Sequence, residues 1–526
     1  MAKSATIFDP LNSAAKPGIN PWLVALTVSL ATFMEVLDTS IANVALNHIA
    51  GNLGAGQDES TWVLTSYLVS NAIIIPISGW LSSVVGRKRF YMSCVALFTI
   101  SSFLCGIAPS LTWLLIFRVM QGAGGGGLAP SEQSMLADTF PPEKRGLAFA
   151  IWGVAVVVAP AIGPTLGGFI TDNYSWRWIF FINIPVGVVS LFLTNLLVQD
   201  PPRAVEATKR ARANGIRIDY IGFALVAIGF GALQIVLDKG QEDDWFSSRF
   251  ILAVTITAVV TLLALIIWET MVVDDPIVDL PLLVNAGLST SMVLQFIVGF
   301  ILSSTTVLIP EFVQYLLGWN ATQAGLVLMP GGIALIIMMP IAGQLVSRVQ
   351  AKYLMAIGLS ITAGSMFYLA TINLGIDFRH LAWVRAFQCI GLPLFFIPLN
   401  TIAYSNLPAG KNNNASALMS LMRNLGGGIG ISLAATMLTR RAQMHQTRLA
   451  SHATPYSQPF VSYMQSLGGF THRNIVGFYG MVQRQASMLA YLDVFKVFAW
   501  GTVGVIVLIL MLKTARRAEN PEMAMH

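Results

Sequence analysis

The chain has 526 residues, of which 55% are hydrophobic and only 11% are charged. A soluble domain carries about 25% charged residues, so this composition excludes an ordinary globular enzyme. The formal net charge is +6. Because the cations stand in short segments between apolar runs, they indicate membrane topology rather than nucleic-acid binding. The sequence therefore predicts an integral membrane protein.

Apolar runs of about 20 residues, the length that crosses a bilayer as a helix, recur from end to end. We expect fourteen spans, at 22–48, 61–84, 90–108, 111–138, 146–170, 177–198, 219–238, 250–270, 287–316, 323–347, 353–373, 380–405, 414–439 and 486–512. Most cations fall in alternate loops, among them Arg87-Lys88-Arg89, the run Arg203 to Arg217, and Lys513-Arg516-Arg517. By the positive-inside rule these loops and both termini are cytoplasmic.

The segment 440–485 would lie outside, although it carries five cations. It is polar with scattered aromatic residues, which fits a solvated loop with one or two surface helices. The alternative is a docking surface for a partner outside the membrane. Long loops are weak evidence of topology, so the segment does not change the predicted orientation.

The first span contains two carboxylates, Glu35 and Asp38, in an otherwise apolar run. Three residues apart on a helix, they share one face. A charge at mid-membrane costs roughly 2.5–3.5 kcal/mol on insertion scales, so such an acid faces a cavity or a partner. A pair of hydrogen-bonded structural acids is one interpretation. The sharper hypothesis is a proton-carrying site beside a substrate path.

An internal repeat relates the two ends of the chain. Pro76-Ile77-Ser78-Gly79 reappears as Pro340-Ile341-Ala342-Gly343, and Arg118-x-x-Gln121 reappears as Arg385-x-x-Gln388, at offsets of 264 and 267. Six spans therefore match six others, with two spans between them. We expect an all-α membrane protein with a six-helix bundle in 1–200, a cytoplasmic linker and two inserted helices in 201–285, and a second bundle in 286–526.

Two arginines and a third acid stand inside spans. Arg118 and Arg385 need a carboxylate, carbonyl groups or a water-filled cavity, because a buried guanidinium without partners is costly. For Arg385 a structural ion pair is as good an interpretation as a mechanistic one. For Arg118 we favour an effect on the protonation of Glu35 or Asp38. Glu132 follows Arg118 on the fourth span, after a run of glycines.

Small residues and prolines mark two segments that favour conformational change. The fifth span carries Pro160, Gly163, Pro164, Gly167 and Gly168, which bend a helix and leave a groove for a neighbour. The first basic loop carries Gly79, Gly86, Arg87 and Lys88. A simple topology anchor is the alternative reading of that loop.

Motifs for nucleotides and metals are missing from the sequence. No phosphate-binding loop and no paired Cys or His motif occurs, and Cys94, Cys105 and Cys389 lie in apolar runs. We expect no cofactor, no metal and no enzymatic activity. A proton gradient is the remaining general energy source, worth about 2.3 kcal/mol per charge per 100 mV.

Several motifs together resemble one family. They are Leu37-Asp38-Thr39-Ser40-Ile41-Ala42-Asn43 in the first span, Gly79 to Arg89, Arg118-x-x-Gln121-Gly122, Gly163-Pro164-x-x-Gly167-Gly168, and Trp176 to Pro185. The chain resembles the major facilitator superfamily, specifically the fourteen-span drug:proton antiporters of the EmrB/QacA type, with the EmrB branch most similar. Ser83 stands where the loop motif usually has Asp, so the charge latch attributed to that acid does not carry over.

The resemblance implies a multidrug efflux antiporter of the bacterial inner membrane that exports lipophilic toxic compounds. It also implies a periplasmic adaptor protein and an outer-membrane channel as partners, Asp38 as the proton carrier and Arg118 in the proton relay. We expect alternating access around a central cavity. Candidate cavity residues are Met34, Asn43, Gln121, Phe296, Phe300, Arg385 and Phe395, and Glu311 is a further candidate site.

Alternatives remain open. A specific exporter of one metabolite or lipid would show a narrow response in a substrate panel. A scaffold or sensor without transport is disfavoured by the presence of Asp38 and Arg118. A membrane enzyme would need a nucleophile or metal set, and no such spacing is recognisable.

Overall fold

A computed structural model describes residues 14–16, 18–202, 205–206, 208–209, 219–273, 276–346, 348–404, 407 and 411–511. Over these residues the chain is helical, with a single isolated bridge between Ala15 and Val198 and no β-strand. The predicted all-α class is confirmed. Most of the basic run Arg203 to Arg217, and all of Lys513, Arg516 and Arg517, lie outside the described residues.

The described residues of the first half form eight helices. They are α1 (Pro21–Leu53), α2 (Gln57–Val85), α3 (Arg87–Gly106), α4 (Leu111–Gly125), α5 (Leu128–Thr139), α6 (Pro142–Asn173), α7 (Trp178–Phe181) and α8 (Asn183–Leu197). Asn20 caps α1 by accepting from the backbone N–H of Trp22 at 3.0 Å. The fourth predicted span is two helices, because the glycines that separate α4 from α5 favour a break.

Two long helices follow the first half. These are α10 (Tyr220–Lys239) and α11 (Arg249–Met271), joined by the short η1 (Trp245–Ser247) and followed by η2 (Leu280–Val284). Helix α10 packs against both α2 and α16, so it contacts both halves. Along α11 only four residues are buried although its mean hydropathy is 2.9. Such an exposed apolar helix is stable only against lipid or another apolar surface.

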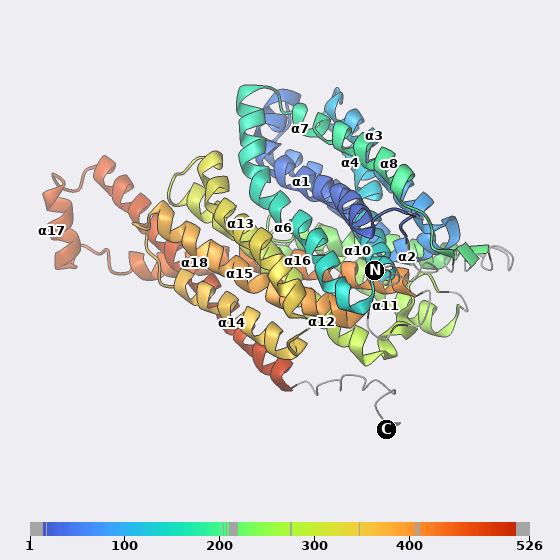
Figure 1. Ribbon diagram of the computed structural model, residues 1–526. Helices are drawn as coiled ribbons and strands as arrows, with labels where there is room; N and C mark the ends of the chain where they lie inside the picture. The colour runs from blue at the N-terminus through green and yellow to red at the C-terminus, as the bar shows by residue number, and fades with distance from the viewer. Residues whose placement is uncertain are drawn as a thin grey trace.

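In the second half, the residues that the structure describes form seven helices. They are α12 (Ala286–Tyr315), α13 (Ala321–Leu345), α14 (Ala351–Leu369), α15 (Phe378–Ala403), α16 (Asn412–Ala450), α17 (Gln458–Ser466) and α18 (His472–Met511). Helices α16 and α18 continue into 440–485, where the sequence predicted a solvated loop with one or two surface helices, and they carry α17 beyond the bundle (Figure 1). The last part of α16 contains no Gly or Pro that would end the helix. Its Arg441 and His445 also contact the carboxylate of Asp493 on α18, which holds the two helices together there.

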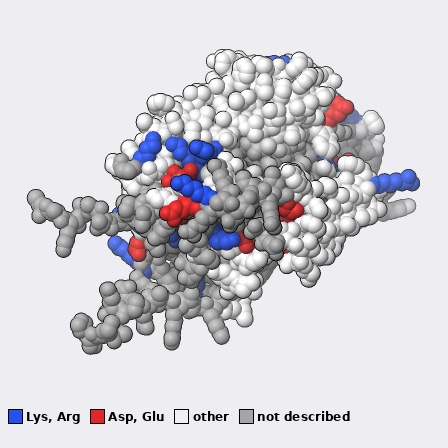
Figure 2. Space-filling view, turned by 90° about the vertical axis from the view of Figure 1, so that its right-hand side faces the viewer, with Lys and Arg blue, Asp and Glu red and all other residues white. Residues whose placement is uncertain are grey.

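Within the described part of the chain, ten helices are long and apolar enough to cross a bilayer, and eleven if the bent α6 counts as one span. On the face shown in Figure 2 most charged side chains gather in one region on the left, a few others stand at the right-hand edge and the top, and wide areas between them are uncharged. The protein is therefore a multi-pass membrane protein, while the count of fourteen spans remains a prediction.

The two halves meet along several helix pairs. Helix α6 packs against α13 and α15, and α16 packs against α2 and α5. The basic end of this bundle is the end that carries Arg87, Lys144 and Lys352, in the first turns of α3, α6 and α14, and Lys411, directly before α16. Close backbone contact occurs there, because a Cβ added to Gly146 would lie 3.0 Å from the carbonyl oxygen of Gly343.

Candidate functional site

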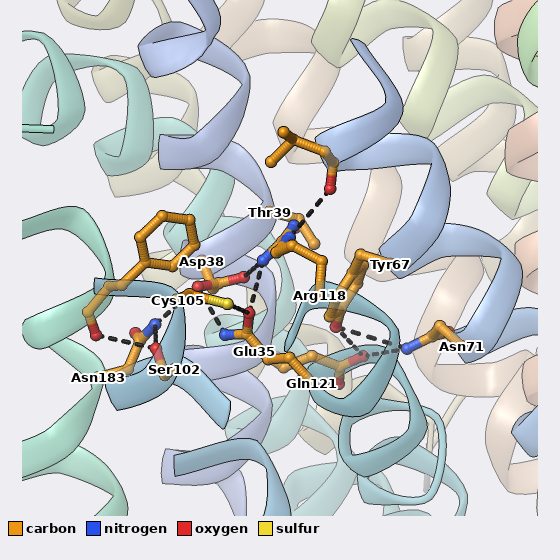
Figure 3. Close-up of polar contacts among 12 residues, drawn as sticks. Glu35, Asp38, Thr39, Tyr67, Asn71, Ser102, Cys105, Arg118, Gln121 and Asn183 are labelled. Atoms are coloured by element: carbon orange, nitrogen blue, oxygen red, sulfur yellow. Dashed lines mark hydrogen bonds and ion pairs between the residues drawn. The ribbon is translucent and has the colours of Figure 1, made fainter. Parts of the chain in front are cut away.

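Asp38 is buried in the first half, with 2% of its surface exposed. One carboxylate oxygen accepts from Arg118 Nη1 at 2.6 Å. The other accepts from Gln121 Nε2 at 2.9 Å and from Asn183 Nδ2 at 2.7 Å. Figure 3 shows these side chains converging from α1, α4 and α8. The carboxylate thus has one charged and two neutral donors, which offset the cost of burying it.

Arg118 is fully buried and has partners for most of its guanidinium. Its Nε donates to the carbonyl of Val63 at 3.0 Å, and its Nη1 also donates to Gln121 Oε1 at 2.8 Å. The guanidinium lies 4.5 Å from the centre of the Tyr67 ring. Gln121 therefore binds both members of the ion pair, which fixes their relative orientation.

Glu35 has its own donors, separate from those of Asp38. Its carboxylate accepts from Asn71 Nδ2 at 3.0 Å and from the Tyr67 hydroxyl at 3.3 Å. Asn71 in turn accepts from Asn424 of α16 at 3.2 Å. A chain of hydrogen bonds therefore joins Glu35 to the second half. The expected joint titration of Glu35 and Asp38 stays a prediction.

Glu132 is fully buried on α5, beyond the glycine break that separates it from Arg118. It accepts from the backbone N–H of Thr32 at 3.1 Å and from Trp152 Nε1 at 2.9 Å, and the Thr32 hydroxyl also donates to it. These donors come from α1 and α6. The first half thus holds three membrane acids, each with a different donor set.

A small cavity of about 20 Å³, with room for a water molecule or little more, lies between the halves. Its lining is Val156, Val157, Val298, Leu302, Met339, Leu392, Phe395, Phe396 and Arg423. Of the predicted cavity residues only Phe395 belongs to this lining; Met34, Asn43, Gln121, Phe296, Phe300 and Arg385 do not. Met34 and Gln121 are buried within the first half, Asn43 is exposed, and Phe300 packs on Phe498 with ring centroids 5.0 Å apart.

Arg385 lies buried in the second half, 4% exposed. It donates to Gln388 Oε1 at 2.6 Å, and to the hydroxyls of Thr305 and Thr306 at 3.3 Å each. None of these partners is a carboxylate. Glu311, the further candidate, is exposed on α12.

The predicted groove of the fifth span is filled by α1. A Cβ added to Gly163 would lie 2.3 Å from Ser40 Oγ, and one added to Gly167 would lie 3.0 Å from Ile41. Gly168 is also buried. The helix bends by 40° between Pro160 and Ile162, as expected where prolines remove backbone donors.

The first basic loop forms a polar contact at the basic end. Gly86 has a φ of 99°, which favours glycine. Arg87 forms an ion pair with Asp138 of α5. Lys88 donates its backbone N–H to Asp200 at 2.7 Å and its Nζ to the carbonyl of Asn195 at 3.0 Å. Ser83 donates to the carbonyl of Trp80 at 2.7 Å, within its own helix.

Three consecutive asparagines of α16 join the halves at the basic end. Asn412 donates to Asp138, and Asn413 is hydrogen-bonded to Ser134. The third, Asn414, packs so closely on Gly79 that a Cβ there would lie 2.9 Å from its Oδ1. The basic end of the bundle is therefore closed.

Sequence reasoning missed several polar residues of the site. Asn183 lies in the quoted sixth-span motif, while Asn71, Trp152 and Arg423 lie singly in apolar spans. Their only signal is a polar group at membrane depth, which predicts a buried partner without saying which one. The three cysteines are buried and free.

Comparison with known proteins identifies the family. The model of the Major Facilitator Superfamily matches residues 28–431. The chain belongs to the major facilitator superfamily. This membership, together with the relatives below, makes it a membrane transporter for small substrates and not an enzyme.

Curated relatives cover nearly the whole chain. It is 38% identical to "Multidrug export protein EmrB" of Haemophilus influenzae over 98% of this chain and 99% of that protein. It is 40% identical to the protein of the same name of Escherichia coli K12, over 90% and 89%. It is 39% identical to "Fatty acid resistance protein FarB" of Neisseria gonorrhoeae, over 86% of each. The chain is thus an EmrB-type member of the superfamily.

Solved structures of other superfamily members share the fold. The proton:xylose symporter XylE matches with a TM-score of 0.59 at 15% identity, over 92% of this chain and 95% of that one. The human organic anion transporter MFSD10 matches with a TM-score of 0.58 at 12% identity, over 91% and 99%. At these identities the likeness concerns the fold alone.

Proposed function

We propose that this transporter is a proton-coupled exporter of lipophilic compounds that works by alternating access. The observation that carries the proposal is the buried contact between Asp38 and Arg118, which Gln121 and Asn183 complete. A carboxylate held by one cation and two amides is stable when charged, and loses its ion pair when it binds a proton. Protonation therefore changes which helix arrangement is favoured.

Glu35 and Glu132 are proposed as further proton-binding groups. Glu35 is joined through Asn71 to Asn424 of the second half, so a change in its charge would act directly on the contact between the halves. Glu132 binds α1 and α6 together through Thr32 and Trp152. Arg118 acts as the counter-ion of Asp38 while that carboxylate is charged.

The cavity between the halves supports a lipophilic cargo. Eight of its nine lining residues are apolar, so the cavity, once widened by separation of the halves, would suit an apolar compound better than a sugar that needs many hydrogen bonds. Names of relatives that refer to multidrug export support this cargo class. The name that refers to fatty acid resistance supports a second candidate, an exporter dedicated to one amphiphile.

The similarity to EmrB-type relatives also supports a proposal for the membrane and the partner proteins. We place the chain in the bacterial inner membrane with both termini and the basic end in the cytoplasm. A periplasmic adaptor and an outer-membrane channel would complete the export path. The end of α16, together with α17 and the start of α18, extends beyond the bundle in Figure 1. This part would face the periplasmic adaptor.

Transport by purified protein in lipid vesicles tests the proposal. The cargo panel is ethidium, Nile red and anilinonaphthalene sulfonate, which are cationic, neutral and anionic lipophilic dyes. We expect wild type to move at least one dye faster when a pH step is imposed, and Asp38→Asn to lose that acceleration. If the transport rate of wild type is the same with and without the pH step, the proposed antiport is wrong. If Asp38→Asn shows the same acceleration as wild type, Asp38 is not the coupling residue.

A further inference from the structure

The loop that follows α10, residues 240–248, stands where the two halves meet at the end of the bundle opposite the basic end, which we call the far end. Helix α10 packs on α2 of the first half and on α16 of the second, and lies between them in Figure 1. Helix α2 begins at the far end, because it runs toward Arg87. Helix α16 begins at the basic end, and Thr436 lies about 36 Å along it from Asn412.

Charged side chains attach the end of α10 to the first half. Lys239 is buried, with 4% of its surface exposed, and its Nζ donates to the hydroxyl of Thr61 on α2. The same Nζ lies 5.6 Å from the centre of the Trp62 ring. Asp238 accepts from the hydroxyl of Thr65, also on α2. Because hydrogen bonds to charged groups are stronger than neutral ones, the inserted helices are held firmly on the first half.

A single neutral hydrogen bond from the loop reaches the second half. Trp245 Nε1 donates to Thr436 Oγ1 on α16 at 3.1 Å, and also to Gln241 Oε1 of its own loop at 3.1 Å. If Thr436 moves away, the bond to Gln241 remains, so the indole N–H is not left without an acceptor. Release of this contact therefore costs less than detachment of Lys239 and Asp238 from α2.

The backbone of the loop is shaped to present the Trp245 side chain. Asp244 has a φ of 55° and Trp245 a φ of 52°, and no other non-glycine residue in the described part of the chain has a positive φ. Side chains with a Cβ rarely adopt this left-handed conformation, and such outliers gather at functional positions. The Trp245 ring folds back over Gly240, where an added Cβ would lie 2.8 Å from it. The strain is thus spent on directing one indole toward α16.

We propose that α10 and α11 travel with the first half during the export cycle, and that Trp245 is the releasable contact that closes the far end against α16. This assignment rests on the proposed alternating access, and it gives the two inserted helices a role. When the far end opens, Thr436 moves away with α16 while Lys239 stays on α2. The contact thereby sets the fraction of molecules whose far end is closed.

Distances between three spin labels test the proposal. Asn52→Cys at the end of α1, Asp243→Cys in the loop and Thr439→Cys on α16 are exposed positions at the far end, and the native cysteines are buried. Double electron–electron resonance measures the labels pairwise in nanodiscs, without cargo or gradient. Label pairs 52–439 and 243–439 report separation of the halves, whereas the pair 52–243 reports movement of the loop on the first half.

Trp245→Phe removes the indole N–H and keeps an aromatic ring. We expect the open population in the pairs 52–439 and 243–439 to rise about fivefold, the effect of one lost hydrogen bond, while the pair 52–243 stays unchanged. Thr436→Val should give the same result, because it removes the acceptor and leaves the bond to Gln241 intact. It also serves as the second variant if Trp245→Phe does not fold. Both substitutions together should add nothing further.

Trp268→Phe is the matched control. It removes a tryptophan hydrogen bond of the inserted helices at the basic end, where Trp268 Nε1 donates to Asp219 at 2.8 Å, and it should leave all three distances unchanged. Distances identical to those of wild type in Trp245→Phe and Thr436→Val would overturn the proposal. A shift of the pair 52–243, or equal opening in Trp268→Phe, would also overturn it. Vesicle transport by wild type at the same rate with and without a pH step would instead contradict antiport, and would leave the role of Trp245 unaffected.

Discussion

At the scale of single residues, Asp38 and Arg118 are a buried ion pair with nearly complete hydrogen bonding. The pair lies at membrane depth, where an isolated charge costs several kcal/mol. Gln121 bonds to both partners and Asn183 fills a further acceptor site. Such a pair is stable only while every member is present, so loss of one member affects both stability and transport.

Arg118→Lys tests the need for the guanidinium shape. One ammonium group cannot reach Val63, Asp38 and Gln121 in the present geometry. We expect thermal unfolding to show a loss of about 1–3 kcal/mol and dye efflux to be largely lost. The matched control is Arg385→Lys, whose hydroxyl contacts are 3.3 Å long and should cost less to change. Equal effects of the two variants would contradict the account.

Trp152→Phe tests the donors of Glu132. The substitution keeps an aromatic ring but removes the Nε1–H that donates to Glu132 at 2.9 Å. A buried acceptor that loses a donor costs about 1–3 kcal/mol. We expect a lowered thermal unfolding temperature for this variant. Trp178→Phe, at a position 56% exposed, should leave the temperature unchanged, and an equal shift in both variants would argue against the buried contact.

At the scale of helices, glycines decide which helices approach closely. Gly163 lets α6 lie against Ser40 of α1, the helix that carries Asp38. Pro160 and Pro164 bend the same helix by 40°. The position of α1, and with it the position of Asp38, therefore depends on α6.

Gly163→Ala should push α1 and α6 apart, because the added Cβ would lie 2.3 Å from Ser40 Oγ. Overpacking of this kind costs about 1–3 kcal/mol. We expect reduced efflux and stability, and partial recovery of both in Gly163→Ala with Ser40→Gly, which removes the clashing atoms. Gly364→Ala has open space around its Cβ and serves as the neutral control. Additive effects of the Gly163 and Ser40 substitutions would show that the contact is not made.

At the scale of the whole molecule, two bundles are joined firmly at the basic end. Asn412, Asn413 and Asn414 bind Asp138, Ser134 and the Gly79 surface of the first half. Alternating access requires this contact to open. Arg145 also donates to the carbonyl of Tyr404 at 3.0 Å, and the Tyr404 hydroxyl donates to Gln133 at 3.2 Å. Loss of the asparagine contacts should therefore shift the population of closed molecules without abolishing the closed state.

Replacing Asn412, Asn413 and Asn414 together by Ala should open the basic end. Spin labels at Glu143→Cys and Gln350→Cys, which are exposed positions in the two halves, report the separation by double electron–electron resonance. The native cysteines are buried and should not label. We expect a new population at longer distance in the triple variant. A distance distribution identical to that of wild type would contradict a latch at these residues.

Much of this architecture follows from the sequence, because spans depend on local hydropathy and the repeat depends on local motifs. Helices occur at every predicted span in the described residues, with α4 and α5 sharing one span and α7 and α8 sharing another. The sequence placed Asp38 and Arg118 in one mechanism through their cost at membrane depth. It could not place Trp152 beside Glu132, or Arg423 in the cavity, because those contacts depend on how helices rotate about their axes. Spacing along one helix carries no information about its partner across the bundle.

The account depends most on Asp38 exchanging a proton while cargo moves the other way. Vesicles that contain the pH-sensitive dye pyranine, and the protein in one orientation, measure this when a transported compound of the dye panel is added. We predict proton movement opposite to the cargo for wild type and none for Asp38→Asn. Cargo movement by wild type without any proton movement, or proton movement that persists in Asp38→Asn, would contradict the account.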